Sequence, residues 1–367
     1  MDTISLARGV PDPALLPLDE IRACAGAVLE RTATTVLAYG GPGGHPGLRV
    51  GIAERHEIDR ACVLVTNGSL QGLALLAAHL LADGRRRVLV ESPTYDRTLK
   101  QLAHLGAEVV RVPVDEEGLD VAALEAQLER GERPAFLYTI PTFQNPTGTT
   151  LSLPRRLRLA QLARAHDLLV VEDDPYALLR LEGEPLPSLF ELLEGDGVVY
   201  ASSFSKTVAP GLRVGYLLLP EHLSGPVEAL AASTYVAPVV LTQAIVAEFL
   251  ARGYLEPSLQ RIRDGLRSRR DALVAALGEH LPVARWTRPA GGYFLWLELP
   301  RAIDACAVLA RAAARGVTFV PGTEFGGGPS SARLAFSAVT SADIHDGIAR
   351  LAEVVRSLPR RLLRRAA

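Results

Sequence analysis

The chain has 367 residues, which is enough for two lobes around a large apolar core. Hydrophobic residues make up 48% of it and charged residues 22%, as in ordinary globular proteins, and a formal net charge of −2 argues against nucleic acid as the main partner. The three cysteines are widely spaced and lack clustered histidines, so we predict no disulfide framework and no metal site. No secretory signal and no apolar stretch of membrane-spanning length is apparent, so we expect a cytoplasmic protein without membrane contacts.

The first part of the chain predicts little regular structure. Residues 1–18 are rich in proline, which favours an extended segment, and a helix is expected from residue 18 to about residue 31. Residues 39–49 contain five glycines. Such a stretch predicts an irregular loop that bends tightly or approaches another group closely.

From residue 61 onward, short β-branched runs alternate with helical patterns. Strands are expected at 63–66, 87–91, 108–112, 135–139, 168–172 and 198–201, with helices at 70–81, 95–105, 121–129 and 154–165. This alternation indicates βαβ units and a mainly parallel sheet with helices on both faces. After residue 220 the pattern is mostly helical, with helices at 226–233, 239–251, 256–280, 303–314 and 341–357 and strands at 291–299, 317–320 and 332–336.

One lysine stands out because the chain almost avoids lysine. Of its 39 basic residues only Lys100 and Lys206 are lysines. An arginine cannot act as an amine nucleophile, whereas a lysine can once its pKa is lowered. Lys206 follows Ser203 and Ser205, so it is a candidate for forming a Schiff base, while Lys100 reads as a surface residue on a polar helix face.

Polar motifs directly follow the predicted strands, and ligands of such sheets bind at the carboxyl ends of strands. Gly68 and Ser69 begin a helix, where free backbone N–H groups suit a phosphate or simply form an ordinary helix start. Asp173 ends a strand, where a buried carboxylate needs a cation or hydrogen bonds, or else caps the next element. Asn145 either donates a side-chain hydrogen bond to a ligand or stabilises a turn.

Together these residues meet the needs of one cofactor, pyridoxal 5'-phosphate. This cofactor requires a lysine for its aldehyde, a carboxylate for its ring nitrogen, donors for its ring oxygen and a helix start for its phosphate. The matching residues, in that order, are Lys206, Asp173, Asn145 with Tyr176, and Ser69. Tyr95 additionally offers a flat face for the ring.

Over nearly its whole length the chain resembles the fold type I, class I/II aminotransferases. The motifs of that family appear here in order: Tyr39 with Gly47-Leu48-Arg49, Gly68-Ser69-Leu70-Gln71, Pro93-Thr94-Tyr95, Asn145-Pro146-Thr147-Gly148, Glu172-Asp173-Asp174-Pro175-Tyr176, Ser203-Phe204-Ser205-Lys206 with Arg213, Gly291-Gly292-Tyr293-Phe294-Leu295-Trp296 and Arg333-Leu334-Ala335-Phe336-Ser337. The branch that looks nearest is the α-aminoadipate/kynurenine type, which also forms the effector lobe of MocR-type regulators. Its cues include Phe143-Gln144-Asn145-Pro146 and the opening Gly9-Val10-Pro11-Asp12-Pro13.

The resemblance implies an α/β fold with two domains. A large domain, residues 31–250, is expected to hold a mainly parallel, seven-stranded-type sheet covered by helices. Residues 1–30 and 251–367 are expected to form a smaller α+β domain. The family also implies a homodimer in which Tyr39 reaches the phosphate in the partner's site, and substrates that are amino acids and 2-oxo acids.

The resemblance further implies a role for each candidate site residue. Lys206 would carry the cofactor and move the substrate proton, and Asp173 and Tyr176 would assist at the ring. Expected cofactor contacts are Tyr39, Gly68, Ser69, Leu70, Gln71, Tyr95, Asn145, Asp173, Tyr176, Ser203, Ser205, Lys206 and Arg213. Expected substrate contacts are Arg333 for the α-carboxylate, with Asn145, Arg8 and Gly9. Arg8 stands where relatives commonly have glycine, and it either recognises a distal carboxylate or is a solvated loop arginine.

Two other functions remain open from the residues alone. The same lysine, aspartate and arginine serve pyridoxal phosphate enzymes that perform β-elimination, cyclisation or decarboxylation, because the reaction depends on which Cα bond aligns with the π system. A transcriptional regulator would need a DNA-binding domain upstream, whereas this sequence starts at the aminotransferase-like lobe. We therefore predict a transaminase ahead of both alternatives.

Overall fold

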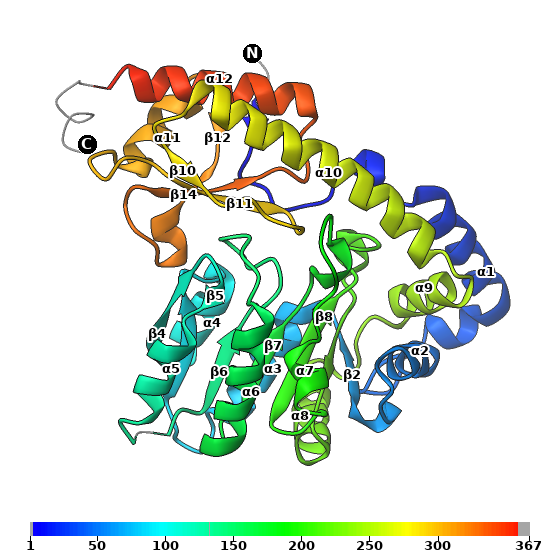
Figure 1. Ribbon diagram of the computed structural model, residues 1–367. Coiled ribbons are helices and arrows are strands. Elements are labelled where there is room, and N and C mark those ends of the chain that lie inside the picture. The colour runs from blue at the N-terminus through cyan, green and yellow to red at the C-terminus, as the bar shows by residue number, and fades with distance from the viewer. Residues whose placement is uncertain (1–2, 132, 359–367) are drawn as a thin grey trace.

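Residues 63–218 contain all the strands of a central sheet in the computed structural model, which describes residues 3–131 and 133–358 (Figure 1). Its strands lie in the order β2-β9-β8-β7-β6-β3-β4-β5. Their bounds are β2 Val63–Thr66, β3 Arg87–Ser92, β4 Glu108–Asp115, β5 Gly118–Leu119, β6 Phe136–Thr139, β7 Val170–Asp173, β8 Val198–Ser203 and β9 Gly215–Leu218. The neighbouring strands β8, β7, β6, β3 and β4 pair in parallel. Strand β9 is antiparallel to both of its neighbours, and β5 is antiparallel to β4.

Alternate residues of these strands pack into two separate cores. In β7, Val170 belongs to one buried cluster and Val171 to the other, and Val198 and Val199 in β8 divide in the same way. This is the period of two expected for a sheet that is covered on both faces. The covering helices are α3 Ser69–Leu80, α4 Asp96–His104 and α8 Glu221–Tyr235 on one face, and α5 Val121–Leu128, α6 Leu153–His166 and α7 Leu189–Leu192 on the other.

A second, smaller sheet lies above the carboxyl ends of the central strands in Figure 1. Its antiparallel order is β10-β11-β14-β13, with bounds β10 Arg285–Trp286, β11 Phe294–Glu298, β13 Val320–Pro321 and β14 Ser331–Ala335. The short β1 Ile4–Ser5 pairs with β12 Val317–Thr318, so the start of the chain joins this second unit. Its helices are α10 Leu255–His280, α11 Ala305–Ala313 and α12 Ser341–Arg356, while α1 Leu18–Val36, α2 Pro46–His56 and α9 Val240–Ala251 lie at the side of the molecule.

The predicted α/β fold is confirmed, with a large and mostly parallel sheet surrounded by helices. Seven of its strands have at least four residues, and the two-residue β5 adds an eighth. The strand β9 is absent from the predicted elements, because its four residues lie between a loop and a helix and carry no alternation of their own. The domain bounds 1–30 with 251–367, and 31–250, stay a prediction.

The prediction of an irregular loop over residues 39–49 is wrong for its last four residues. Helix α2 begins at Pro46, and the ring Nδ1 of His45 accepts a hydrogen bond from the backbone N–H of Leu48 at 3.2 Å. Proline is favoured in the first turn of a helix because its missing N–H needs no partner there. Burial of Leu48 and Ile52 then outweighs the weak helix propensity of the glycines.

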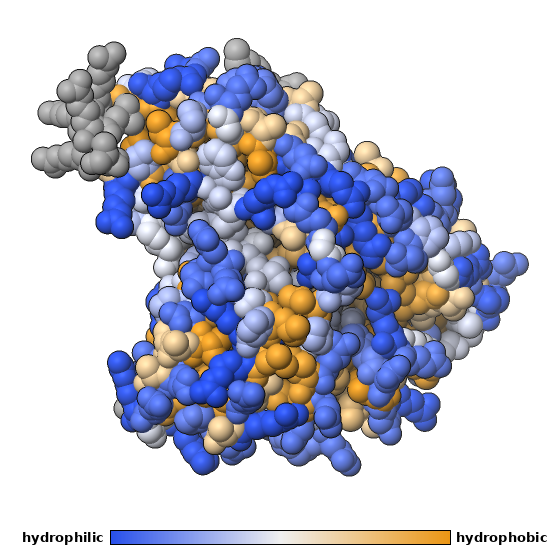
Figure 2. Space-filling model, in the orientation of Figure 1, coloured by the Kyte–Doolittle hydropathy of each residue, from blue (hydrophilic) through white to orange (hydrophobic). Residues whose placement is uncertain are grey.

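The surface seen in Figure 2 is mostly hydrophilic, with hydrophobic residues in separate patches. None of the helices in the described part of the chain is both long and apolar enough to cross a membrane. The cytoplasmic location stays a prediction.

Candidate active site

A cavity of about 440 Å³ lies where the carboxyl ends of the central strands face β11 and β14. Most of the predicted site residues line it: Arg8, Gly9, Ser69, Leu70, Tyr95, Asn145, Asp173, Tyr176, Ser203, Ser205, Lys206, Arg213 and Arg333. They come from loops and elements that are distant in sequence, and the parallel topology brings them to one edge of the sheet. The geometry thus gathers these side chains around one space.

Three predicted residues do not line this cavity. Gly68 packs against the guanidinium of Arg213, which does line the cavity, and a side chain at Gly68 would overlap that group. The side chain of Gln71 is turned away, and its Oε1 accepts a hydrogen bond from the backbone N–H of Asn67 at 2.9 Å. Tyr39 is 89% exposed and lies outside the cavity of its own chain.

Lys206 follows β8 and reaches into the cavity. Its Nζ donates a hydrogen bond to the carbonyl oxygen of Gly9 at 2.6 Å. Burial lowers the pKa of the Lys206 amine to about 8, and the positive charges of Arg333 and Arg213 act in the same direction. A neutral amine is therefore accessible near physiological pH, as nucleophilic and general-base chemistry requires.

We expect chemical labelling of Lys206 to report this lowered pKa. In cofactor-free protein, the rate of acetylation by trace acetic anhydride should rise with pH to a midpoint near 8, because only the neutral amine reacts. Peptide mass spectrometry separates the Lys206 product from that of Lys100, the other lysine of the chain. A midpoint at the ordinary lysine value of 10.5 would contradict the electrostatics of the site.

Asp173, the last residue of β7, is 4% exposed. Its Oδ2 accepts a hydrogen bond from the hydroxyl of Tyr138 at 2.7 Å, whereas its buried Oδ1 has no partner among the described residues. Burial raises the pKa of Asp173 to about 7, with further contributions from the negative charges of Asp174 and Glu91. A buried carboxylate oxygen without a partner is rare, and it indicates that a donor from a ligand completes the site.

The other end of the cavity is built to receive an anion. Helix α3 begins at Ser69 after Gly68, which has a φ of +89° and provides no side-chain cap for the first turn. A side chain at Gly215 would overlap the backbone nitrogen of Ser69, so strand β9 supports this turn closely. The exposed N–H groups and the helix dipole both favour negative charge.

Cationic and hydroxyl groups surround this helix start. Arg213 donates from Nη2 to the carbonyl oxygen of Asn67 at 3.3 Å and from Nη1 to Ser205 Oγ at 3.4 Å. Ser203 Oγ donates to Ser205 Oγ at 2.9 Å. These groups can provide donors to a phosphate without large rearrangement.

Arg333 lies on β14 and points into the cavity from the second sheet. It is 8% exposed, and its guanidinium carbon lies 4.2 Å from the ring centroid of Phe294 and 4.7 Å from that of Phe325. Nη1 donates to Asn145 Oδ1 at 3.0 Å and Nη2 to the carbonyl oxygen of Ala7 at 2.7 Å. Burial lowers the pKa of Arg333, although the group stays charged, and its Nε has no partner among the described residues.

Aromatic residues line the cavity between the start of α3 and Arg333. Tyr95 stands at the start of α4 and lines the cavity, and Tyr176 is buried with its ring 5.9 Å from that of Phe294, edge to face. Burial raises the pKa of Tyr176 well above its ordinary value, so its hydroxyl remains protonated and available as a donor. Arg8 also lines the cavity and is exposed to solvent.

Sequence reasoning missed the roles of Tyr138, Phe294 and Arg97. Tyr138 donates a hydrogen bond to the carboxylate of Asp173, and the ring of Phe294 packs against the guanidinium of Arg333. Arg97 lines the cavity. Tyr138 lies opposite Val171 in the register between β6 and β7. No local pattern shows this pairing, since it depends on which strands become neighbours.

These residues fit pyridoxal phosphate on observations of this structure. The unpartnered Oδ1 of Asp173 suits a protonated ring nitrogen, and the uncapped start of α3 with Arg213 suits a phosphate. The neutral amine of Lys206 suits an aldehyde. Arg333 leaves donors for a carboxylate on the opposite side.

Comparison with known proteins supports the same cofactor. Residues 2–351 match the family model described as aminotransferase class I and II. The chain is 37% identical to aromatic-amino-acid aminotransferase 1 of Thermococcus litoralis, over 97% of this chain and 88% of that protein, and 39% identical to 2-aminoadipate transaminase of Thermus thermophilus, over 97% and 90%. The crystal structure of α-aminoadipate aminotransferase from Thermus thermophilus, complexed with N-(5'-phosphopyridoxyl)-L-leucine, superposes with a TM-score of 0.93 at 36% identity, covering 99% of this chain and 93% of the other.

Proposed function

The chain belongs to the class I and II aminotransferases and is a pyridoxal phosphate-dependent transaminating enzyme, and from this premise we propose how its cavity moves an amino group from an L-amino acid to a 2-oxo acid. The observation that carries the proposal is the single cavity shared by the Lys206 amine, the free Oδ1 of Asp173 and the Arg333 guanidinium. When bound, the cofactor supplies an aldehyde that takes up the amino group and a ring that accepts electrons from Cα.

Lys206 is proposed to hold the cofactor covalently and then to carry the proton. Once the substrate amine has displaced it, the Nζ of Lys206 would accept the proton from the substrate Cα and would deliver it to the carbon of the former aldehyde group, on the other side of the nitrogen. The pKa of about 8 suits this role, because a general base works best when its pKa lies near the working pH. Gly9, whose carbonyl accepts from Nζ, orients the amine between these steps.

Asp173 is proposed to keep the ring nitrogen protonated through its free Oδ1, with Tyr138 holding the other oxygen. Asn145 and Tyr176 are proposed donors to the ring oxygen, and Tyr95 is proposed to cover the ring face. The phosphate is assigned to the helix start at Gly68, Ser69, Leu70 and Gln71 together with Ser203, Ser205 and Arg213.

Arg333 is proposed to bind the α-carboxylate of the substrate, which fixes the Cα–H bond relative to the ring. We expect Arg333→Lys to raise KM for amino acids about 10- to 100-fold with a smaller change in kcat, because a bidentate charge-assisted contact becomes a single one. Steady-state kinetics on an accepted amino acid measures both constants. Arg285→Lys, at an exposed position of β10, serves as the matched control. Unchanged KM in Arg333→Lys would place the carboxylate elsewhere.

A homodimer with Tyr39 acting in the partner's site is also proposed. Tyr39 belongs to a group of large apolar side chains that are all more than half exposed, with Leu37, Val236 and Val239. The backbone N–H of Val239 donates to Asn67 Oδ1 at 3.0 Å, so Val239 adjoins the start of α3, where the phosphate is proposed to bind. A second copy docked here would bury these side chains and bring Tyr39 to the partner's cavity.

We expect mixing of two impaired variants to restore activity if Tyr39 acts across the dimer. A mixed dimer of Lys206→Ala and Tyr39→Ala subunits contains one intact site, so random mixing should recover about one quarter of wild-type turnover. Co-refolded and separately refolded proteins are assayed side by side. Activity no higher than the sum of the separate variants would place Tyr39 outside the partner's site.

Incubation with single amino acids tests the proposed reaction. Each accepted amino acid should convert the bound cofactor to its amine form, which is visible in its absorbance spectrum, and should release the matching 2-oxo acid. Release of ammonia or carbon dioxide instead would identify elimination or decarboxylation. The same screen decides between the two interpretations of Arg8, because a distal carboxylate contact requires acidic amino acids to react better than neutral ones.

A further inference from the structure

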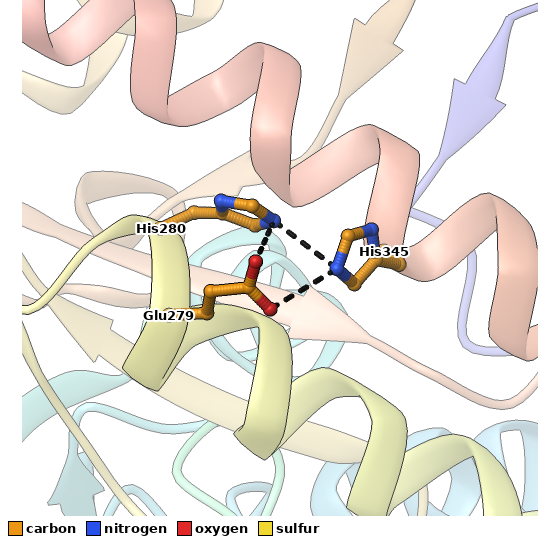
Figure 3. Close-up of side chains that lie close together, drawn as sticks. All are labelled: Glu279, His280 and His345. Carbon is orange, nitrogen blue, oxygen red and sulfur yellow. Dashed lines mark hydrogen bonds and ion pairs between the residues drawn. The ribbon is translucent and has the colours of Figure 1, made fainter.

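Three potential metal ligands meet on the second unit, outside the residues that line the active-site cavity (Figure 3). Glu279 and His280 end helix α10, and His345 lies in the first half of α12. One ligand atom from each residue lies within 4.8 Å of the others. His280 and His345 are 65 positions apart, so no motif in the sequence connects them.

The separations between these atoms match those around a small metal ion. His280 Nε2 and His345 Nε2 are 3.2 Å apart, His345 Nε2 and Glu279 Oε2 are 3.3 Å apart, and His280 Nε2 and Glu279 Oε1 are 3.6 Å apart. Ligand atoms about 2.0–2.1 Å from a tetrahedral zinc ion lie about 3.3–3.4 Å from one another. The two histidine nitrogens are thus at the separation of two zinc ligands, and Glu279 presents one of its two carboxylate oxygens to each of them.

Hydrogen bonds among Glu279, His280 and His345 cannot satisfy all of their polar atoms at once. Two imidazole Nε2 atoms that face each other share at most one proton in a hydrogen bond, and two protonated rings at this distance repel. In Figure 3 the two Nε2 atoms face each other, and each also faces one carboxylate oxygen of Glu279. A divalent cation satisfies all three at once.

The two helices hold the ligands in place independently of any ion. Leu273 and Leu277 of α10 and Ile344 and Ile348 of α12 are buried in the same core cluster. This packing fixes the spacing of the helices, so little conformational freedom is lost on binding. The carboxyl end of α10 also carries the negative end of the helix dipole, which favours a cation.

We propose that Glu279, His280 and His345 bind one divalent transition-metal ion, for which zinc is the representative, and thereby fasten the end of α10 to α12. Two imidazoles and one carboxylate favour zinc, cobalt, nickel or copper(II) over calcium and magnesium, which prefer oxygen ligands alone. Glu279 and His345 are exposed, so water has access to the remaining coordination position. The role is structural, since none of the three residues lines the active-site cavity.

Titration of untagged, chelator-treated holoenzyme with zinc chloride tests the site. Calorimetry should detect one tight equivalent per chain, and bound Co²⁺ should show the visible bands of tetrahedral coordination. His345→Ala and Glu279→Gln should each weaken zinc binding at least about tenfold, as loss of a ligand requires. Zinc should raise Tm in the wild type but not in His345→Ala. Transaminase activity should stay unchanged in both variants.

His104→Ala is the matched control, because His104 is, like His345, an exposed histidine in a helix, and it lies outside the Glu279, His280 and His345 cluster. It should bind zinc as the wild type does. Glu279→Gln changes only an exposed side chain, so this variant should fold normally. It therefore tests zinc binding even if His345→Ala fails to fold. Absence of a stoichiometric site in the wild type, or wild-type zinc affinity in both Glu279→Gln and His345→Ala, would overturn the proposal.

Discussion

Lys206→Ala is expected to reduce transamination by at least about 10⁴-fold, the largest effect of any substitution considered for this enzyme. The variant removes the amine that would join the cofactor covalently. The same amine would carry the proton from the substrate Cα to the former aldehyde carbon of the cofactor. The other side chains around the cavity remain, so amino acids and cofactor should still bind. Turnover, together with the absorbance of the bound cofactor, measures the loss of both roles.

Lys100→Ala is the matched control for this substitution. Lys100 is the second lysine of the chain, and its Nζ lies 3.1 Å from Asp96 Oδ2 on the exposed side of α4. Its variant should keep wild-type turnover. Added small amines should restore part of the activity of Lys206→Ala, because they can transfer the proton in place of Nζ. Full activity in Lys206→Ala without any added amine would refute the assigned role.

Local chemistry identified Lys206, whereas sheet pairing determined what surrounds it. A lysine retained in an arginine-rich chain, among hydroxyls and after a strand, is visible in the sequence alone. Its contact with the carbonyl of Gly9 spans 197 positions and depends on how the two units dock. The same limit applies to Tyr138, which acts on Asp173 only because β6 and β7 are neighbours.

Side-chain direction was a second limit. Gln71 belongs to the motif at the phosphate end, but its side chain bonds the backbone of Asn67. For α2, the five glycines predicted a loop, whereas burial of Leu48 and Ile52 produced a helix from Pro46 onward. Patterns of residue type predict which elements form and which motifs lie at strand ends. They do not predict rotamers, or the point at which packing overrides propensity.

Asp173→Asn is expected to lower kcat about 10²- to 10³-fold, the second large effect. Asparagine has the same shape and can still accept the hydrogen bond from Tyr138, so the change removes chiefly the negative charge. Without that charge the ring nitrogen loses its proton, and the ring accepts electrons from Cα less readily. Steady-state kinetics and the spectrum of the bound cofactor measure the loss. Tyr138→Phe keeps the charge and should reduce kcat less.

Asp173→Asn is expected to lower activity but to raise the stability of the cofactor-free protein, and the two effects are measured independently. The folded-state pKa of Asp173, about 7, is higher than its ordinary value of 3.8, so the folded state binds this proton more tightly than the unfolded state. The contribution of Asp173 to stability is therefore present at low pH and is lost as pH rises toward 7. The amide introduced by Asp173→Asn carries no charge to bury, so Tm of the cofactor-free variant should exceed that of wild type at pH 8 and approach it near pH 5. A lower Tm at pH 8 would mean that Lys206 and Tyr138 already compensate the buried charge without the cofactor.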